Sequence, residues 1–255
     1  MTDVMLHAFF LQDETEAPMQ YIRSLLFHIL FLLVTSYYAL SGWLLILVGI
    51  SRESMVKRLR RRSKIVTRRL LPVAGVRFEC RNFVQPIQGP AIICANHESA
   101  LDTVIFHELT EDPAYWMKSE LFRIPFFGVC ARFVGMIEVD RSGNIRHLSQ
   151  TMRSSKEALK RWQTIVAFPE GTRASLAHPI PYQSGIYSLY KRAELPIIPV
   201  AIASGNCWGK KAFLLKPGTI QVSFLEPIPP GLSKQELMWR LENVIRAEQL
   251  RLKAA

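Results

Sequence analysis

The chain has 255 residues, of which 49% are hydrophobic, and it carries a formal net charge of +11. This length and apolar content are sufficient for one large folded domain with a smaller appended segment, which excludes a chain without a core. The charge alone is compatible with a nucleic acid or an anionic membrane as partner. The four cysteines show neither a metal-binding spacing nor a disulfide framework, which is typical of a reducing compartment.

The N-terminal part of the chain contains a long uncharged segment. Residues 1–20 form a mixed segment with acidic residues, and we expect a poorly ordered tail there. Residues 25–50 then follow without a single charged side chain. As a helix they would extend about 39 Å, which exceeds a hydrocarbon core of about 30 Å. This length predicts attachment to a membrane rather than a helix buried in a protein core.

A basic segment follows at residues 52–71. Between Arg52 and Arg69 nine basic residues stand against one acidic residue, so this window carries +8 and the rest of the chain only +3. A basic block beside an apolar helix is typical of the cytoplasmic side of a membrane with anionic headgroups. No aromatic and basic groove pattern occurs elsewhere, which argues against nucleic acid. The pattern fits an interfacial amphipathic helix, and a solvated charged helix fits it equally well.

Beyond Pro72, short β-rich runs alternate with helical windows, and we predict an α/β domain at residues 73–255 that folds without the membrane-associated helices of residues 21–72. The predicted strands are residues 76–80, 91–95, 115–117, 136–139, 164–168, 197–203 and 219–225. The predicted helices are residues 99–109, 125–133, 145–162, 184–193 and 233–252. This alternation predicts a mostly parallel multi-strand sheet flanked by helices.

A histidine and an aspartate follow the second predicted strand. An Asp that holds a neutral imidazole in the right tautomer makes it a general base for a hydroxyl group. His97 and Asp102 are five residues apart, which would place them about 140° apart on a regular helix. We therefore expect His97 in the loop and Asp102 in the first turn of the next helix, with the carboxylate folded back onto the ring.

A second polar cluster, residues 168–173, follows the predicted strand that ends near Phe168. Its Gly171 allows backbone N–H groups to approach an anion, and Arg173 offers a planar fork for phosphate. Another arginine, Arg141, follows the strand predicted at residues 136–139. Because sites form where parallel strands end, we expect these loops to converge and to bind a phosphomonoester or a similar anion.

Taken in order, these blocks resemble the bacterial 1-acyl-sn-glycerol-3-phosphate acyltransferase family, also called the lysophosphatidic acid acyltransferase family. The resemblance covers about residues 20–250, and the matching blocks are residues 96–102, 118–121 with Pro125 and Gly128, 135–141, 168–173 and 196–200. Two positions depart from the family pattern. Ala174 stands where the family often has Ser, and Gln183 stands where Lys is common.

The resemblance implies transfer of a fatty acyl group from acyl-CoA or acyl-carrier protein to the sn-2 hydroxyl of lysophosphatidic acid, which forms phosphatidic acid in phospholipid biosynthesis. It implies His97 as the general base and Asp102 as its orienting partner. It further implies a glycerol phosphate site made by Arg141, Glu170, Gly171, Thr172 and Arg173. Lys118 is an additional candidate for this site. No acyl-enzyme is expected, because no Ser or Cys lies in an activated nucleophile motif.

The acyl donor is a substrate in this scheme, so no bound cofactor or metal is expected. Together with the basic block, the resemblance places the chain on the cytoplasmic face of the bacterial inner membrane. Two alternatives stay open. The acceptor is another lysolipid, for instance a lyso-ornithine lipid, or the chain is a non-catalytic membrane protein that binds lipid.

Overall fold

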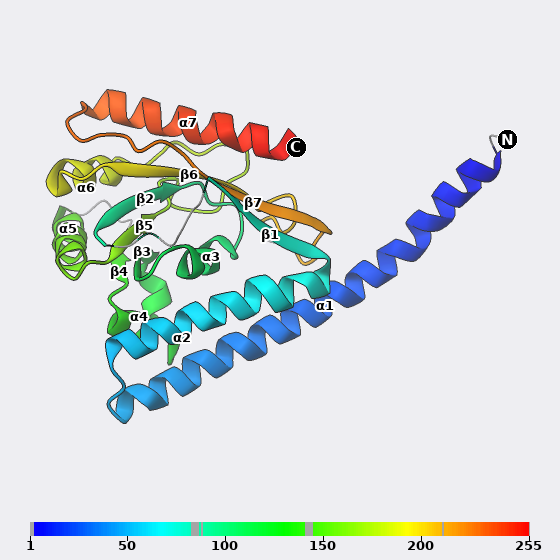
Figure 1. The fold of residues 1–255 in the computed structure, drawn as a ribbon, viewed down its shortest axis with the longest axis horizontal. Helices are drawn as coiled ribbons and strands as arrows, with labels where there is room; N and C mark the ends of the chain where they lie inside the picture. The colour runs from blue at the N-terminus through cyan, green and yellow to red at the C-terminus, as the bar shows by residue number, and fades with distance from the viewer. Residues whose placement is uncertain (1–2, 83–86, 88, 141–144, 211, 255) are drawn as a thin grey trace.

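The computed structural model describes residues 3–82, 87, 89–140, 145–210 and 212–254. A seven-stranded sheet forms its centre, in the order β1-β7-β6-β2-β5-β3-β4 (Figure 1). The strands are β1 Val76–Arg81, β2 Ala91–Ala95, β3 Pro113–Lys118, β4 Ile137–Val139, β5 Thr164–Ala167, β6 Ile197–Ala203 and β7 Gly218–Phe224. Neighbouring strands are parallel except β6 and β7. The predicted mostly parallel sheet is therefore confirmed.

Helices cover both faces of this sheet. They are α3 Asp102–Leu109, α4 Phe127–Val134, α5 Ile145–Lys160, α6 Gly185–Ala193 and α7 Lys234–Ala254, with a short 3-10 helix η3 at Ser119–Arg123. In Figure 1, α7 lies on one side of the sheet, and α3 with the N-terminal helices lies on the other. The five predicted helices are all observed, with ends that differ from the predicted ends by three residues or fewer.

The central strands are apolar at nearly every position because both faces of the sheet are buried. Successive side chains of a strand point to opposite faces. Ile93 and Ala95 accordingly join the core on the α3 side, whereas Ile92 and Cys94 join the core beneath α5, α6 and α7.

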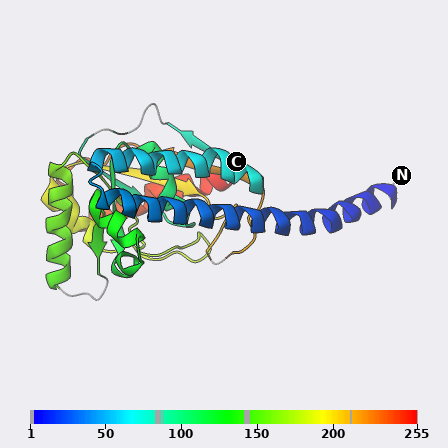
Figure 2. The same cartoon turned by 90° about the horizontal axis from the view of Figure 1, so that it is seen from below.

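Two long helices form an antiparallel pair along the α3 side of the domain, α1 at Asp3–Leu47 and α2 at Arg52–Ile65 (Figures 1 and 2). Within the described residues, Pro18–Leu47 is the one segment long and apolar enough to cross a membrane, and only 11% of its most apolar window is buried. A core helix of a water-soluble domain would be mostly buried. The exposed apolar helix therefore indicates membrane association.

The structure bears on two expectations about the N-terminal region. The structure begins α1 at Asp3, where the sequence suggests a poorly ordered tail; residues 3–17 contain neither Gly nor Pro, so no residue type there ends a helix. The contacts of the segment after α2 also argue against a domain that folds without it. Val66 and Leu71, which follow α2, are fully buried in the same core as β2 and β6.

Polar contacts tie α2 to the domain as well. Arg52 makes a bidentate ion pair with Asp112, with N–O distances of 2.7 and 2.8 Å. Thr67, just after α2, donates a hydrogen bond of 2.7 Å to the carboxylate of Glu108 on α3. Removing residues 1–72 would therefore expose core side chains and leave buried polar groups without partners.

Candidate active site

The loops that follow β2 and β5 meet because these two strands are parallel neighbours in the sheet. His97 lies in the first loop, and residues 168–174 form the second. Lys118 ends β3, on the other side of β5. The predicted convergence is thus observed for these loops, whereas Arg141 lies outside the described residues.

The structure brings the predicted histidine and aspartate together. His97 Nδ1 lies 2.9 Å from Asp102 Oδ2, and Asp102 is the first residue of α3, as the spacing predicts. The same oxygen accepts the backbone N–H groups of Glu98 and Ser99, both at 2.8 Å. Asp102 is fully buried, while 15% of the His97 side chain is exposed. Three donors on one carboxylate oxygen hold this side chain in a single position.

The orientation of the imidazole follows from these contacts. Because Nδ1–H donates to Asp102, the other ring nitrogen, Nε2, is left with a lone pair that can accept a proton. The ring stacks on Phe168, with the centroids 4.4 Å apart and an interplanar angle of 22°. His97 is therefore held both by hydrogen bonding and by an aromatic face, a role of Phe168 that the sequence does not reveal.

The loop after β5 clamps the backbone of His97 from both sides. The N–H of His97 donates to the Glu170 carboxylate at 2.8 Å, and the N–H of Ala174 donates to the His97 carbonyl at 2.7 Å. Gly171 adopts a φ of 73°, in the left-handed region that favours glycine, and its N–H donates to the Phe168 carbonyl. That N–H closes a turn and is therefore not among the backbone N–H groups that this loop could offer to an anion.

Glu170 has an unusual environment for a carboxyl group. Burial raises its pKa to about 8; the N–H of His97 opposes this shift, and the nearby carboxylates of Asp102, Glu98 and Glu242 add to it. A carboxyl group with this pKa is mostly protonated near neutral pH. It therefore adds little negative charge to a loop that also contains Arg173.

The remaining residues of this loop are half-buried. Thr172 and Arg173 lie between Gly171 and Ala174, which contacts His97. Within the described part of the chain, the Arg173 guanidinium has no hydrogen bond or ion pair. Lys118 pairs with the exposed Glu120 at 2.6 Å. Arg173 and Lys118 therefore lie near the His97–Asp102 pair without forming hydrogen bonds or ion pairs with its buried groups.

Two further residues of the first loop anchor it to distant parts of the chain, and the sequence does not reveal these roles. The Asn96 amide both accepts from the N–H and donates to the carbonyl of Ile202, at 2.7 and 2.8 Å. The buried Glu98 carboxylate accepts from the Gly205 N–H, Gln249 Nε2 and Lys253 Nζ. No local pattern could reveal these partners, because they lie more than 100 residues away.

His97 opens into a cavity of about 370 Å³ between the sheet edge and the N-terminal helices. Phe168, Gly171 and Lys118 line it beside His97. Most of its remaining wall is apolar and comes from α1, α2, α3 and η3–α4, for instance Phe31, Tyr38, Met55, Leu59, Val104, Leu121, Phe127 and Val134. The contribution of α1 and α2 to this wall is invisible in the sequence, since it depends on how they dock.

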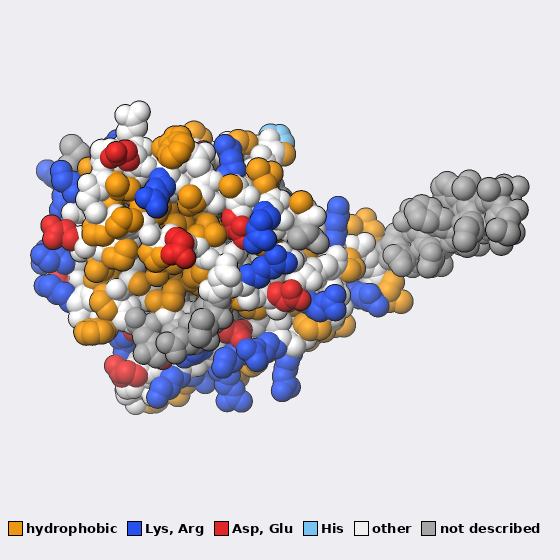
Figure 3. Space-filling model, turned by 45° about the horizontal axis from the view of Figure 1, so that its top comes forward, with side chains coloured by type: hydrophobic (Ala, Val, Ile, Leu, Met, Phe, Trp, Pro, Cys, Tyr) orange, Lys and Arg blue, Asp and Glu red, His pale blue; other side chains and the backbone are white. Residues whose placement is uncertain are grey.

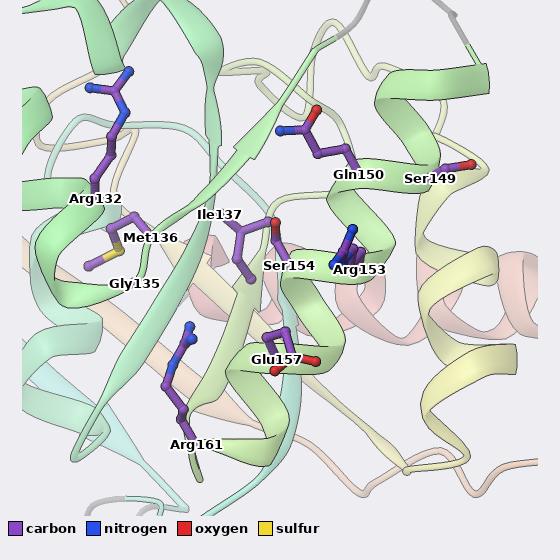
Figure 4. Close-up of a pocket in the computed structure, with 10 residues that line it drawn as sticks. All are labelled: Arg132, Gly135, Met136, Ile137, Ser149, Gln150, Arg153, Ser154, Glu157 and Arg161. Carbon is purple, nitrogen blue, oxygen red and sulfur yellow. The ribbon is translucent and has the colours of Figure 1, made fainter.

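A second and larger hollow, of about 720 Å³, lies between α4, β4 and α5 (Figure 4). Its arginines come from different places and do not converge on one point in Figure 4. Arg132 donates to the Phe122 carbonyl and Arg161 to Gln163, so both are held by the protein. This hollow contains neither residue of the His97–Asp102 pair, and the smaller cavity is the candidate active site.

A buried carboxylate that orients a histidine beside an apolar cavity defines a site able to activate a hydroxyl group next to an apolar substrate. Residues 75–203 match the family model described as Acyltransferase, and the chain belongs to this family. The match begins just before β1 and ends with β6, so it contains both loops of the site.

Curated relatives carry a more specific name. A 1-acyl-sn-glycerol-3-phosphate acyltransferase of Pseudomonas aeruginosa is 33% identical over 150 residues, which are 59% of this chain and 58% of that protein. The Escherichia coli protein of the same name is 31% identical over 164 residues, or 63% of this chain and 66% of that protein. The aligned part of the chain thus spans between one half and two thirds of these relatives.

A solved structure shows the same fold. The crystal structure of the 1-acyl-sn-glycerophosphate (LPA) acyltransferase, PlsC, from Thermotoga maritima superposes with a TM-score of 0.75 at 23% identity. The superposition covers 92% of this chain and 98% of that chain. The N-terminal helices and the α/β domain therefore recur together in that structure.

Proposed function

We propose that the chain transfers a fatty acyl group from a thioester, acyl-CoA or acyl-carrier protein, to the sn-2 hydroxyl of lysophosphatidic acid, forming phosphatidic acid. The observation that carries this proposal is the His97–Asp102 pair at an apolar cavity beside an apolar helix. The names of the curated relatives support the same acceptor.

In the proposed reaction, His97 Nε2 removes the proton of the lipid hydroxyl as its oxygen attacks the thioester carbonyl carbon. The tetrahedral intermediate expels the thiolate of the donor, which takes the proton from His97 and leaves as a thiol. Asp102 keeps the imidazole in the required tautomer and stabilises the imidazolium between the two steps. No bond to the protein forms in this scheme.

A direct transfer also fits the cysteines near the site. Cys130 lines the cavity, but burial raises its pKa, so that its thiol stays protonated and is a poor nucleophile. Cys94 on β2 is fully buried, and burial raises its pKa as well. The apolar cavity is suited to an acyl chain, because each buried methylene contributes about 0.8 kcal/mol.

We assign the phosphate of the acceptor to the cationic residues around the two loops. Arg173, with Thr172 beside it, is the candidate on the loop after β5, and Lys118 is the candidate at the end of β3. Arg141, which the resemblance implies, lies outside the described residues. The largely neutral Glu170 would position His97 rather than contact the lipid. The basic residues of α2 can bind anionic lipid headgroups, which supports an enzyme that acts at the cytoplasmic face of a membrane.

The proposal is tested with the purified full-length chain in mixed micelles that contain lysophosphatidic acid and either palmitoyl-CoA or palmitoyl-carrier protein. We expect phosphatidic acid as the product, detected by mass spectrometry. His97→Ala should reduce kcat about a thousandfold. His178→Ala, which removes an exposed histidine of the adjacent loop, is the matched control and should keep the parent rate.

A panel of acceptors separates the remaining alternatives. Turnover of lyso-ornithine lipid, without turnover of lysophosphatidic acid, would assign the chain to another acceptor. Binding of lysophosphatidic acid without any product, with either donor, would make the chain a lipid-binding protein and end the proposal.

A further inference from the structure

Four large apolar side chains lie exposed between the end of β3 and the first turn of α4. They are Leu121, Ile124, Phe126 and Val129, which are 39%, 47%, 40% and 42% exposed. We call these four residues the apolar corner. Exposed apolar residues are common singly, but a cluster within one short segment marks a site of contact with a partner.

The backbone fixes the exposure of Phe126. Its φ of 60° and ψ of −49° form a conformation that an aromatic residue rarely adopts. The turn is also tight, because a Cβ atom at Gly128 would lie 2.1 Å from the Phe122 carbonyl oxygen. The corner is thus a firmly built projection rather than a frayed loop, and packing into the core would require a different backbone.

The apolar corner continues the exposed apolar face of α1. The Phe126 ring contacts the Trp43 ring of α1, with the centroids 5.0 Å apart. Next to it, the thiol of Cys130 contacts the Ala39 carbonyl at 3.5 Å. Figure 2 shows α4 directly beside α1. From residue 22 to residue 47, the exposed face of α1 carries large apolar residues, including Ile22, Leu25, Ile29, Leu33, Tyr37, Leu40, Leu44 and Leu47.

The charges around the corner fit a lipid surface. Arg123 and Arg132 are exposed next to it, and the nearby acid, Glu120, is paired with Lys118. Apolar side chains bordered by cations match acyl chains bordered by anionic headgroups. On the face seen in Figure 3, apolar side chains are interspersed with acidic and basic ones.

The cavity that contains His97 lies between the corner and the N-terminal helices. Leu121 and Phe127 line it on one side, and Tyr38 and Ala39 of α1 line it on the other. We propose that the apolar corner inserts into the same bilayer leaflet as α1, so that corner and helix form two walls of an opening through which lipid reaches His97 sideways from the leaflet. The access role rests on the proposed function; the insertion does not.

Insertion is measured with an environment-sensitive fluorophore, nitrobenzoxadiazole, attached to Ile124→Cys in the full-length protein. Leu250→Cys on α7 is the matched control, since Leu250 is an exposed apolar residue of the other face. The fluorescence of the parent protein treated with the same label is subtracted. On vesicles of phosphatidylcholine and phosphatidylglycerol we expect a blue shift and quenching by brominated lipid at position 124 alone. A water-like spectrum at position 124 would overturn the insertion.

Access is measured as the ratio of activity on vesicle-embedded lysolipid to activity on the same lipid in detergent micelles. We expect Ile124→Ser and Val129→Ser to lower this ratio several-fold, while Leu250→Ser keeps the ratio of the parent. An unchanged ratio in both corner variants would overturn the access role. Because the fluorescence needs no turnover, a failure of the proposed function is distinguishable from a failure of the insertion.

Discussion

Lys253 Nζ lies 2.5 Å from the carboxylate of Glu98, which joins the last turns of α7 to the loop that carries His97. The two residues are 155 positions apart, and Glu98 is only 2% exposed. The C-terminal helix thereby holds the residue next to the general base. The contribution of the Lys253–Glu98 ion pair to stability and its contribution to the position of His97 can be measured separately.

Lys253→Met should remove the cation from a buried carboxylate. We expect a loss of about 3 kcal/mol in the free energy of unfolding, because a buried charge left without its partner is costly. A fall in kcat of about tenfold should accompany it, since a small displacement of His97 suffices. Urea unfolding in detergent and steady-state kinetics measure the two effects. Lys160→Met, which breaks an exposed pair with Glu157 on α5, should leave both unchanged.

Asp102→Asn tests the electrostatic role of the carboxylate. The amide oxygen can still accept the two backbone N–H groups, but the charge that stabilises the imidazolium is lost. We expect kcat to fall about a thousandfold with little change in KM. Glu226→Gln, which neutralises an exposed carboxylate, is the control. A variant that retains a tenth of the parent rate would contradict this role for Asp102.

Glu170 should make stability depend on pH. Its pKa is raised from 4.5 to about 8, so the folded chain retains a proton that the unfolded chain releases. Stability should therefore fall as pH rises from about 4.5 to about 8. Glu170→Gln should flatten this decline in unfolding experiments between pH 5 and pH 8. The exposed Glu226→Gln should keep the decline of the parent; equal slopes in all three proteins would refute the assignment.

Ala39→Phe should shorten the cavity, because Ala39 belongs to its wall on α1. We expect a preference for shorter acyl donors, with about a fourfold change in kcat/KM for each methylene that no longer fits. Competition between donors of different length measures this preference. Leu40→Phe changes the adjacent, exposed residue and should not alter it. An unaltered preference in Ala39→Phe would place the acyl chain elsewhere.

Deletion of residues 1–72 should prevent folding. It removes Val66 and Leu71 from the core, and each large side chain of this kind contributes about 1.5–3 kcal/mol. It also leaves Asp112 without Arg52. Circular dichroism and thermal unfolding in detergent test this expectation against a deletion of residues 1–17, which should fold. A cooperative unfolding transition in the chain that lacks residues 1–72 would support a separable domain.

Much of this fold was predictable because its elements carry strong local patterns. Apolar runs of four to seven residues predict buried strands, and their alternation with helices predicts the parallel sheet. The site was predictable in part for the same reason: His97 and Glu170 follow two such runs directly. The five-residue spacing correctly places Asp102 in the first turn of α3.

Other features depend on partners that are distant in the sequence. The stacking of Phe168 on His97 and the anchoring of Glu98 by Gln249 require the sheet to be assembled first. The engaged N–H of Gly171 is a similar case, since a glycine in a loop suits a turn as well as an anion site. The docking of α2 was missed because its charges suggest solvent or lipid, whereas Arg52 forms its ion pair with the domain.

The sequence by itself determined which residues can do chemistry and which segments are apolar, because both depend on side chains and on spacing along the chain. Only the tertiary structure decided where these groups meet. It placed α1 and the apolar corner on opposite sides of one cavity, and it buried Glu170 among other carboxylates. The physical reason is that desolvation, electrostatic coupling and cavity shape arise between segments, and no single segment contains them.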